Sequence, residues 1–146
     1  LIGASLVGVD LTGADLEEAD LWQADVSFSN LFRASVDDAN FYEADLSSAA
    51  LQGADLSGAE LGLAQMVAAD LSYADLQSAT LDDANLQYAN LTRANLEGAY
   101  WSYSDQETAA SRLSWITWKE TICGDGTPSS EENPRCYWDI ELEEDR

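Results

Sequence analysis

The sequence predicts a solenoid, a fold in which one short unit is repeated and stacked, and two observations support this prediction. From Leu1 to Trp101 an apolar residue returns at every fifth position without interruption. Two residues before most of these positions stands a small residue, usually alanine, as at Ala14 and Ala54. A helix would space its apolar residues three and four apart, and a half-buried strand would alternate them. A five-residue period therefore requires a backbone path of its own.

The repeated unit, A-(D/N)-L-x-x, also predicts which side chains form the core. A residue and its second neighbour share one face of an extended chain, so the alanine and the leucine point inward and the other three residues point outward. Glycines such as Gly13 and Gly53 are expected to adopt a positive φ at tight corners. Units with Glu, Ser, Tyr or Arg at that position are expected to turn differently, so that the corners need not all share one turn type.

The unit resembles that of the pentapeptide repeat proteins over about two thirds of the chain. The resemblance implies an all-β solenoid, a right-handed quadrilateral β-helix with one unit per face and four units per coil. The repeats then form about five coils, and with neighbouring strands ~4.8 Å apart the tube is about 24 Å long. The resemblance implies no particular activity, because such solenoids serve many ends.

Two regions follow from the point at which the repeat stops: a repeat domain over 1–104 and a cap with a tail over 105–146. Residues 104–107 have the form of a capping box, which predicts a small C-terminal helix. Its apolar face is expected to lie across the last coil and to contain Leu113, Trp115, Ile116, Trp118 and Ile122.

The opposite end has no comparable cap, since Leu1 already stands in the repeat register. An open coil exposes backbone edges and apolar core. We therefore expect this N-terminal end to form a homodimer with a second copy or to be covered by further residues.

The charge of the chain restricts its partners. The formal net charge is −22, with six basic residues, so no basic patch is present to bind the phosphates of nucleic acid. A protein partner is expected to be basic or to bind through apolar contacts. No apolar run approaches the length needed to span a membrane.

Both cysteines, Cys123 and Cys136, lie outside the repeat. They flank a polar loop in a chain without histidine, which favours a disulfide over a metal site and thereby an oxidising compartment. Closing this loop would stabilise it by roughly 3 kcal/mol. The segment from Cys123 to Cys136 also resembles the tail of exported pentapeptide repeat proteins, which implies the thylakoid lumen or the periplasm. A reduced pair in a cytoplasmic protein is the alternative.

Catalytic chemistry has little support in this sequence. The chain has no histidine, so it has no imidazole base, no serine triad and no imidazole metal ligand. A pair of carboxylates would need a cleft that desolvates them and separates their pKa values, and a convex tube offers none. We therefore predict no enzyme, no cofactor and no metal. One column with a twenty-residue spacing raises the question of calcium: Asp15, Ser35, Asp55, Asp75 and Asn95. Single carboxylates in a line do not surround an ion, so these side chains are expected to bond nearby backbone instead.

An apolar stripe provides the candidate interaction patch. Ile2, Trp22 and Tyr42 share one outward position on three successive coils, and Phe28 and Phe32 lie on adjoining faces of the second coil. The alternative is that the stripe stabilises the tube by stacking between neighbouring strands. An acidic face is predicted to be merely solvated; it contains Glu17, Glu18, Asp37 and Asp38.

Two functions follow from these observations. The first is a non-enzymatic structural or protein-interaction scaffold in an exported, oxidising compartment. The second follows from the resemblance, because some pentapeptide repeat proteins mimic duplex DNA and bind DNA gyrase, which requires strong negative charge. The length of the tube opposes the second function, since ~24 Å corresponds to about seven base pairs.

Overall fold

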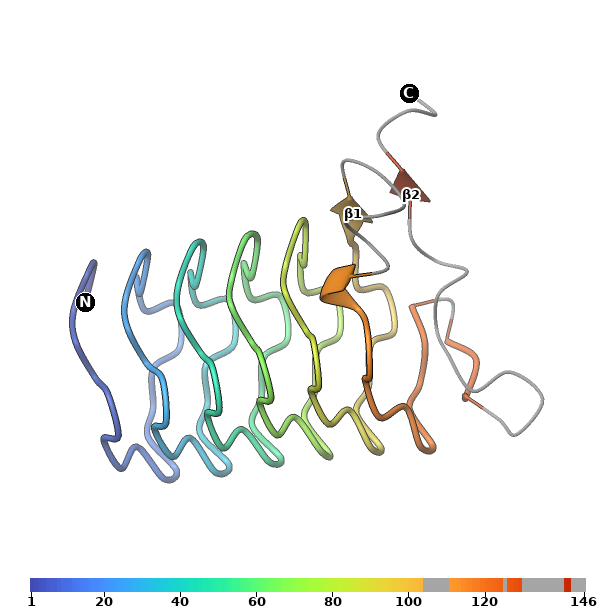
Figure 1. Ribbon diagram of the computed structural model, residues 1–146. Helices are drawn as coiled ribbons and strands as arrows, with labels where there is room; N and C mark the ends of the chain where they lie inside the picture. Colours follow the sequence, from blue (N-terminus) through green and yellow to red (C-terminus); the bar gives the residue numbers. More distant parts are fainter. Residues whose placement is uncertain (104–110, 125, 130–140, 143–146) are drawn as a thin grey trace.

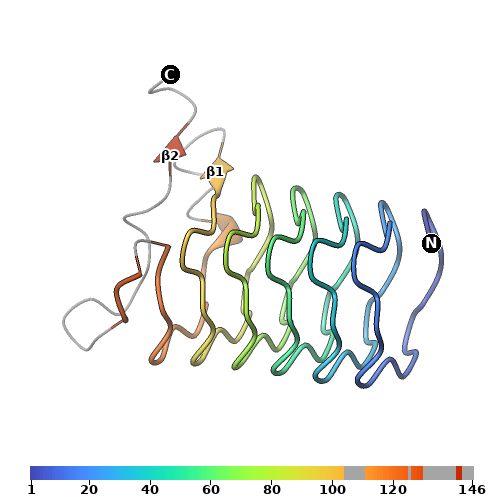
Figure 2. The same cartoon turned by 180° about the vertical axis from the view of Figure 1, so that it is seen from behind.

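The computed structural model describes residues 1–103, 111–124, 126–129 and 141–142. Successive coils stack in one row, with the N-terminus at one end and the C-terminal segments at the other (Figures 1 and 2). Parallel backbone bridges join equivalent positions of neighbouring coils, from Ser5↔Asp25 to Thr80↔Tyr100. The two partners of each of these bridges are separated by four units of the repeat, so one coil consists of four units arranged around the tube.

The core consists of the two inward residues of each unit. From Leu21 to Leu96 every central residue of a unit is at most 1% exposed, and so is the small residue of each unit from Ala24 to Ala94. Ser29 replaces alanine at one of these positions, and its hydroxyl donates to the carbonyl oxygen of Val26 over 2.6 Å. The prediction of an inward alanine and leucine is confirmed.

The corners share one conformation, and the prediction that they differ is wrong. The second residue after each central position has a positive φ in every unit, 53–63° for non-glycine residues and 61–70° for glycines of the repeat. Stacking imposes this conformation. At Ser48, for example, the backbone N–H donates to Val67 on the next coil, and the following N–H, of Ala49, closes the turn to Leu46. A left-handed non-glycine residue costs about 1–2 kcal/mol, which the paired coils offset.

The only named strands of the described residues follow the fifth coil. Strand β1 (Ser102–Tyr103) pairs in parallel with strand β2 (Glu141–Leu142), in the register Ser102↔Glu141. The Tyr103 hydroxyl donates to the carbonyl oxygen of Ala84 over 2.8 Å, and burial raises the pKa of Tyr103 above its usual range. The N–H of Asp83 donates to the carbonyl oxygen of Ser102 over 2.9 Å, so the β1 backbone continues the path of the coils.

The repeat resumes after residue 110, where a helical cap was predicted. Thr117 bridges Asn90 and Ile122 bridges Asn95, so the step along the sequence is longer here than between the earlier coils. Leu113, Trp118 and Cys123 are buried at the central positions of this further coil. The predicted helix is thus wrong over 113–123, where repeat units replace it.

The rest of the predicted cap and tail lies partly outside the described residues and partly within them. Residues 104–110 and 130–140, including Cys136, lie outside the described residues, and of the described ones only Ser111 and Arg112 are helical. Beyond the further coil the chain folds back, with an antiparallel bridge between Ile122 and Pro128 and a bond from the N–H of Cys123 to the carbonyl oxygen of Thr127 over 2.7 Å.

Candidate interaction surface

The outward side chains of the tube form four corner columns, because equivalent corners of successive coils lie side by side. In the first coil, corner A contains residues 2 and 3, corner B residues 7 and 8, corner C residues 12 and 13, and corner D residues 17 and 18. Each column continues at the regular step of one coil up to coil five. Corner A keeps this step onto Ser102, whereas corners B and C continue at a longer step onto the further coil.

Corner A contains the apolar stripe expected from the sequence. The N–H of Gly3 donates to the carbonyl oxygen of Trp22 over 2.8 Å, and that of Gln23 donates to Tyr42 over 3.0 Å. Ile2, Trp22 and Tyr42 therefore lie on adjacent coils, and all three are exposed. Among the described residues, the rings of Trp22 and Tyr42 form no stacked or edge contact with each other.

The stripe ends at Gly62, where the Tyr42 ring covers the glycine backbone. A Cβ at Gly62 would lie 2.9 Å from two atoms of this ring, too close for a side chain. A larger residue at this position would therefore have to displace the exposed Tyr42 ring. The next corner A residue is Asp82, whose carboxylate accepts from the backbone and the hydroxyl of Ser102.

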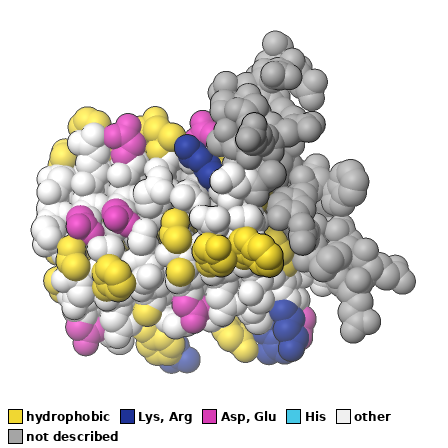
Figure 3. Space-filling model, viewed as in Figure 1, with side chains coloured by type: hydrophobic (Ala, Val, Ile, Leu, Met, Phe, Trp, Pro, Cys, Tyr) yellow, Lys and Arg dark blue, Asp and Glu magenta, His cyan; other side chains and the backbone are white. Residues whose placement is uncertain are grey.

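The two phenylalanines of the predicted patch do not join this stripe. Phe28 lies on corner B, and Phe32 lies on corner C, where the Arg33 guanidinium sits 5.0 Å from its ring centre. The five predicted residues thus occupy three corners rather than one patch. Apolar side chains accordingly appear as separate groups on the surface (Figure 3).

Three exposed aromatic residues were absent from the predicted patch: Tyr73, Tyr88 and Trp115. Trp115 was expected to lie on the last coil as part of the cap, and its 76% exposure shows that this expectation is wrong. Trp115 stacks on Tyr88, with 6.5 Å between the ring centres and 8° between the planes. The regular step between coils already places Tyr88 in the Phe28 column and Tyr73 in the Arg33 column. Trp115 could not be placed in this way, because the step changes before the further coil.

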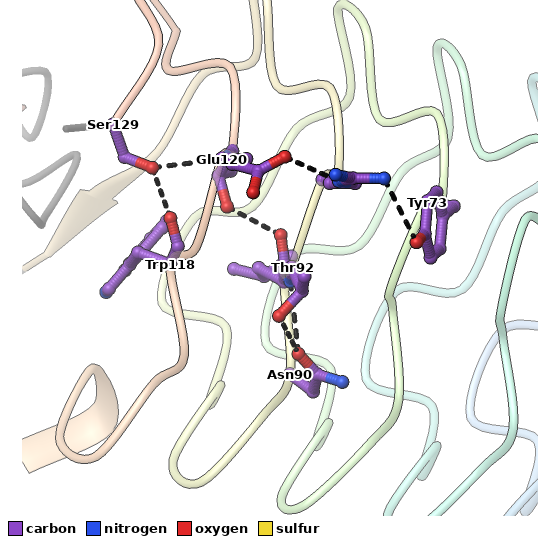
Figure 4. A network of polar contacts seen from close by, with 9 residues as sticks. Tyr73, Asn90, Thr92, Trp118, Glu120 and Ser129 are labelled. Atoms are coloured by element: carbon purple, nitrogen blue, oxygen red, sulfur yellow. Dashed lines mark hydrogen bonds and ion pairs between the residues drawn. The ribbon is translucent and has the colours of Figure 1, made fainter.

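Corner C carries a polar ladder that crosses onto the further coil (Figure 4). Arg93 donates from Nε to Glu120 over 2.6 Å, and its guanidinium lies 5.6 Å from the centre of the Tyr73 ring. The hydrogen bond from Arg93 lowers the pKa of Glu120. Both charged side chains are half exposed, so the pair contributes little to stability. The ladder mainly orients the side chains of this corner.

The Asp and Asn residues between corners are turned toward their own backbone. The Asp55 carboxylate accepts from the N–H of Ser57 over 3.1 Å, and Asp75 accepts in the same way from Gln77. In the part of the chain that the structure describes, no group of three or more acidic or cysteine side chains is arranged to hold a metal ion. The carboxylates of this column thus cap turns, as expected.

Corner D is acidic on its first two coils. Repulsion from Asp37, one coil away, is the largest cause of a raised pKa at Glu17; the smaller contributions come from desolvation, Glu18, Asp15 and Asp38. A raised pKa in the folded state means that ionised Glu17 opposes folding. When the pH falls through the raised pKa of Glu17, its carboxylate is protonated and the repulsion disappears, which stabilises the fold. When the pH rises through the same pKa, this stabilisation is lost.

Glu17→Gln is accordingly expected to raise the melting temperature at pH 7. The difference should vanish near pH 3, where the glutamate of the parent is protonated as well. Thermal unfolding followed by circular dichroism at both pH values measures this effect. Glu97→Gln, a substitution in the same column far from Glu17, is the control. An equal gain in both variants, or a gain that persists at low pH, would contradict local repulsion.

The repeat is also found by comparison with known families. A family model of pentapeptide repeats matches residues 1–31, 27–62 and 64–100, with 8 copies. The chain belongs to the pentapeptide repeat family. Its four-sided stack of parallel coils is accordingly the right-handed quadrilateral β-helix of pentapeptide repeat proteins.

One similar pentapeptide repeat structure is HetL, a protein involved in heterocyst differentiation regulation from the cyanobacterium Nostoc sp. strain PCC 7120. The two chains are 32% identical with a TM-score of 0.55, over 88% of this chain and 65% of HetL. This chain thus spans just under two thirds of the length of HetL. No protein of curated function matches the sequence.

Two further pentapeptide repeat structures are more distant. One comes from the thylakoid lumen of Arabidopsis thaliana, with 26% identity and a TM-score of 0.40, over 90% of this chain and 72% of that one. The other is QnrB1, a plasmid-mediated fluoroquinolone resistance protein, with 19% identity and a TM-score of 0.42, over 77% and 63%. Neither likeness is close enough to support an argument about function.

Among the residues that the structure describes, no helix has the length and the apolar character needed to cross a membrane.

Proposed function

We propose that this chain is a non-enzymatic protein-interaction scaffold that acts in an exported, oxidising compartment, the thylakoid lumen or the periplasm. The observation that carries the proposal is the exposed stripe of Ile2, Trp22 and Tyr42 on corner A. Adjacent exposed apolar side chains are typical of protein-binding surfaces. The absence of ring contacts between Trp22 and Tyr42 favours binding over intramolecular stacking as the reason for these residues.

The stripe begins at the first coil, where the inward residues are less well covered than elsewhere. Leu6, Leu11 and Leu16 are only partly buried, and their backbone pairs with the second coil alone. We include in the proposal that a second copy pairs end to end with this coil and forms a homodimer. Such a contact would cover the exposed Ile2 and the partly buried leucines of this coil.

The compartment is proposed from the cysteines. Cys123 is buried at a central position of the further coil, and we propose that it forms a disulfide with Cys136. Stable disulfides are typical of oxidising compartments. The bond would attach the tail to the coil that ends the β-helix.

Mass spectrometry of the native chain after alkylation of free thiols tests the disulfide. We expect no added alkyl group without reductant and two after reduction and unfolding, the latter step exposing buried Cys123. Two added groups in the unreduced, unfolded chain would show that both cysteines are free thiols and would favour a reducing compartment instead. A Cys123→Ser/Cys136→Ser variant, which takes up no alkyl group, is the control for labelling elsewhere.

The acidic residues of corner D favour a second candidate, a DNA mimic that binds DNA gyrase. Glu17, Glu18, Asp37 and Asp38 lie together on two adjacent coils of a chain with a net charge of −22. A gyrase supercoiling assay separates the two candidates. Unchanged supercoiling at a large excess of protein would exclude the mimic and leave the scaffold.

A further inference from the structure

Corner B is the only corner of the described β-helix without a charged residue. Corners A, C and D contain Glu43, Arg33 and Glu17, for example. Corner B is uncharged on all coils and consists of Val7, Gly8, Ser27, Phe28, Ser47, Ser48, Val67, Ala68, Gln87, Tyr88, Ser114 and Trp115. A chain with a net charge of −22 thus has one neutral edge along its length.

The aromatic residues of corner B are among the most exposed large hydrophobic residues that the structure describes. The exposed fraction is 67% for Phe28, 56% for Tyr88 and 76% for Trp115. All three have a positive φ, a conformation that glycine adopts without strain and bulky residues rarely adopt. The same corner forms with glycine, serine or alanine on other coils, as at Gly8 and Ser48, so the turn itself does not require these rings. Trp115 and Tyr88 stack on each other, yet both stay exposed, and exposed aromatic side chains on a neutral edge favour a role in binding.

Small side chains separate the two aromatic ends of corner B. Ser48 and Ala68 occupy the positions between Phe28 and Tyr88, and both are exposed. Phe28 and Tyr88 are three coils apart, which corresponds to about 14 Å along the tube. An α-helix with its side chains is ~10–12 Å across, so one helix fits between the rings with its axis across the corner.

Carboxylates lie on both sides of the stretch formed by Ser48 and Ala68. Asp45 precedes it on the face toward corner A, and Asp70 follows it on the face toward corner C. Asp70 is fixed by bonds from the side chains of Gln52 and Asn90, and Asp45 by the N–H of Ser47. A helix that crosses the corner would therefore meet small, uncharged side chains between the aromatic rings and negative charge beyond them.

We propose that corner B binds an amphipathic basic helix of another protein, seated on Ser48 and Ala68 between Phe28 and the Tyr88–Trp115 pair. The inference rests on the scaffold function proposed above and adds a second surface with a defined partner. The apolar face of the helix contacts the rings, and its Lys or Arg side chains face Asp45 and Asp70. A second copy of this chain does not fit this corner. Contact between two such corners would bring together two chains that each have a net charge of −22, and it would pair no backbone edge in return.

The test uses the full chain and three synthetic 18-residue peptides, labelled for fluorescence anisotropy. One has a leucine face bordered by lysine, the second has glutamate in place of lysine, and the third has serine in place of leucine. We expect the Leu/Lys peptide alone to bind with measurable affinity. Equal binding of the Ser/Lys peptide would show that binding depends on charge alone. Equal binding of the Leu/Glu peptide would show that the positive charge of the helix does not matter. Either result overturns the proposal.

Ala68→Lys places a long cationic side chain at the centre of the seat and is expected to weaken binding of the Leu/Lys peptide about tenfold or more. Ser78→Lys is the matched control, because Ser78 has the same positive φ and the same corner position on corner D of the same coil. An equal loss in both variants would overturn the proposal. Circular dichroism of each variant verifies its fold.

Trp115→Ser and the double variant Trp22→Ser/Tyr42→Ser separate this inference from the proposed function. We expect Trp115→Ser to weaken binding of the Leu/Lys peptide and the corner A variant to leave it unchanged. Loss of binding in the corner A variant alone would place the interaction on corner A, which overturns the corner B proposal and leaves the scaffold function intact. Failure of the peptide to bind at any site also overturns the corner B proposal.

Discussion

Deletion of Ser57 is expected to abolish the cooperative unfolding of the β-helix, whereas removal of the whole coil 41–60 is not. Losing one residue shifts every later unit by one position, so the inward residues from Leu61 to Leu96 leave the core. Each of these side chains contributes about 1.5–3 kcal/mol by burial. A few of them equal the total stability of a typical domain, about 5–15 kcal/mol.

Removal of 41–60 leaves every remaining residue in its column, because the deleted segment equals one period of the bridges. The shortened chain is expected to unfold cooperatively, with lower stability because one set of contacts between coils is lost. Urea unfolding followed by circular dichroism compares the two deletions with the parent. A cooperative transition of parental amplitude after deletion of Ser57 would show that a local bulge absorbs the missing residue, contrary to this prediction.

Phe41→Ala is expected to lower the free energy of unfolding by about 3–5 kcal/mol. Phe41 is completely buried and stands in a column between Leu21 and Leu61, so no side chain can move into the space without leaving its own position. Urea unfolding at constant pH measures the loss.

Phe41→Leu is the matched control, because leucine is the residue of the two neighbouring coils at this position. It should cost far less than alanine. A loss below about 1 kcal/mol for Phe41→Ala would show that the coils collapse onto the cavity, and an equal loss for both variants would show that ring shape rather than volume matters.

The sequence was sufficient to predict the core but not the corners. Period and polarity identify inward residues such as Leu51 and Ala54, because burial tolerates few alternatives there. The conformation of Glu18 or Ser48 follows instead from hydrogen bonds to the next coil, which local propensity does not contain. Propensity favours a different turn for these residues, and tertiary pairing overrides it.

The further coil was missed for a related reason. Its inward positions hold Trp118 and Cys123 in place of leucine, and an insertion interrupts the period before it. The same interruption concealed the stacking of Trp115 on Tyr88. Arithmetic on the sequence did place Ile2, Trp22 and Tyr42 in one column and Phe28 and Phe32 on other faces of the second coil.

The uniform corner conformation has a consequence for how such a protein changes over evolutionary time. Positions with a positive φ accept glycine, acidic, basic, hydroxyl and aromatic side chains alike without altering the backbone. Selection can therefore alter recognition by single substitutions while foldability, which depends on the inward residues, is inherited unchanged. A change of binding specificity is thereby separated from any change of the core.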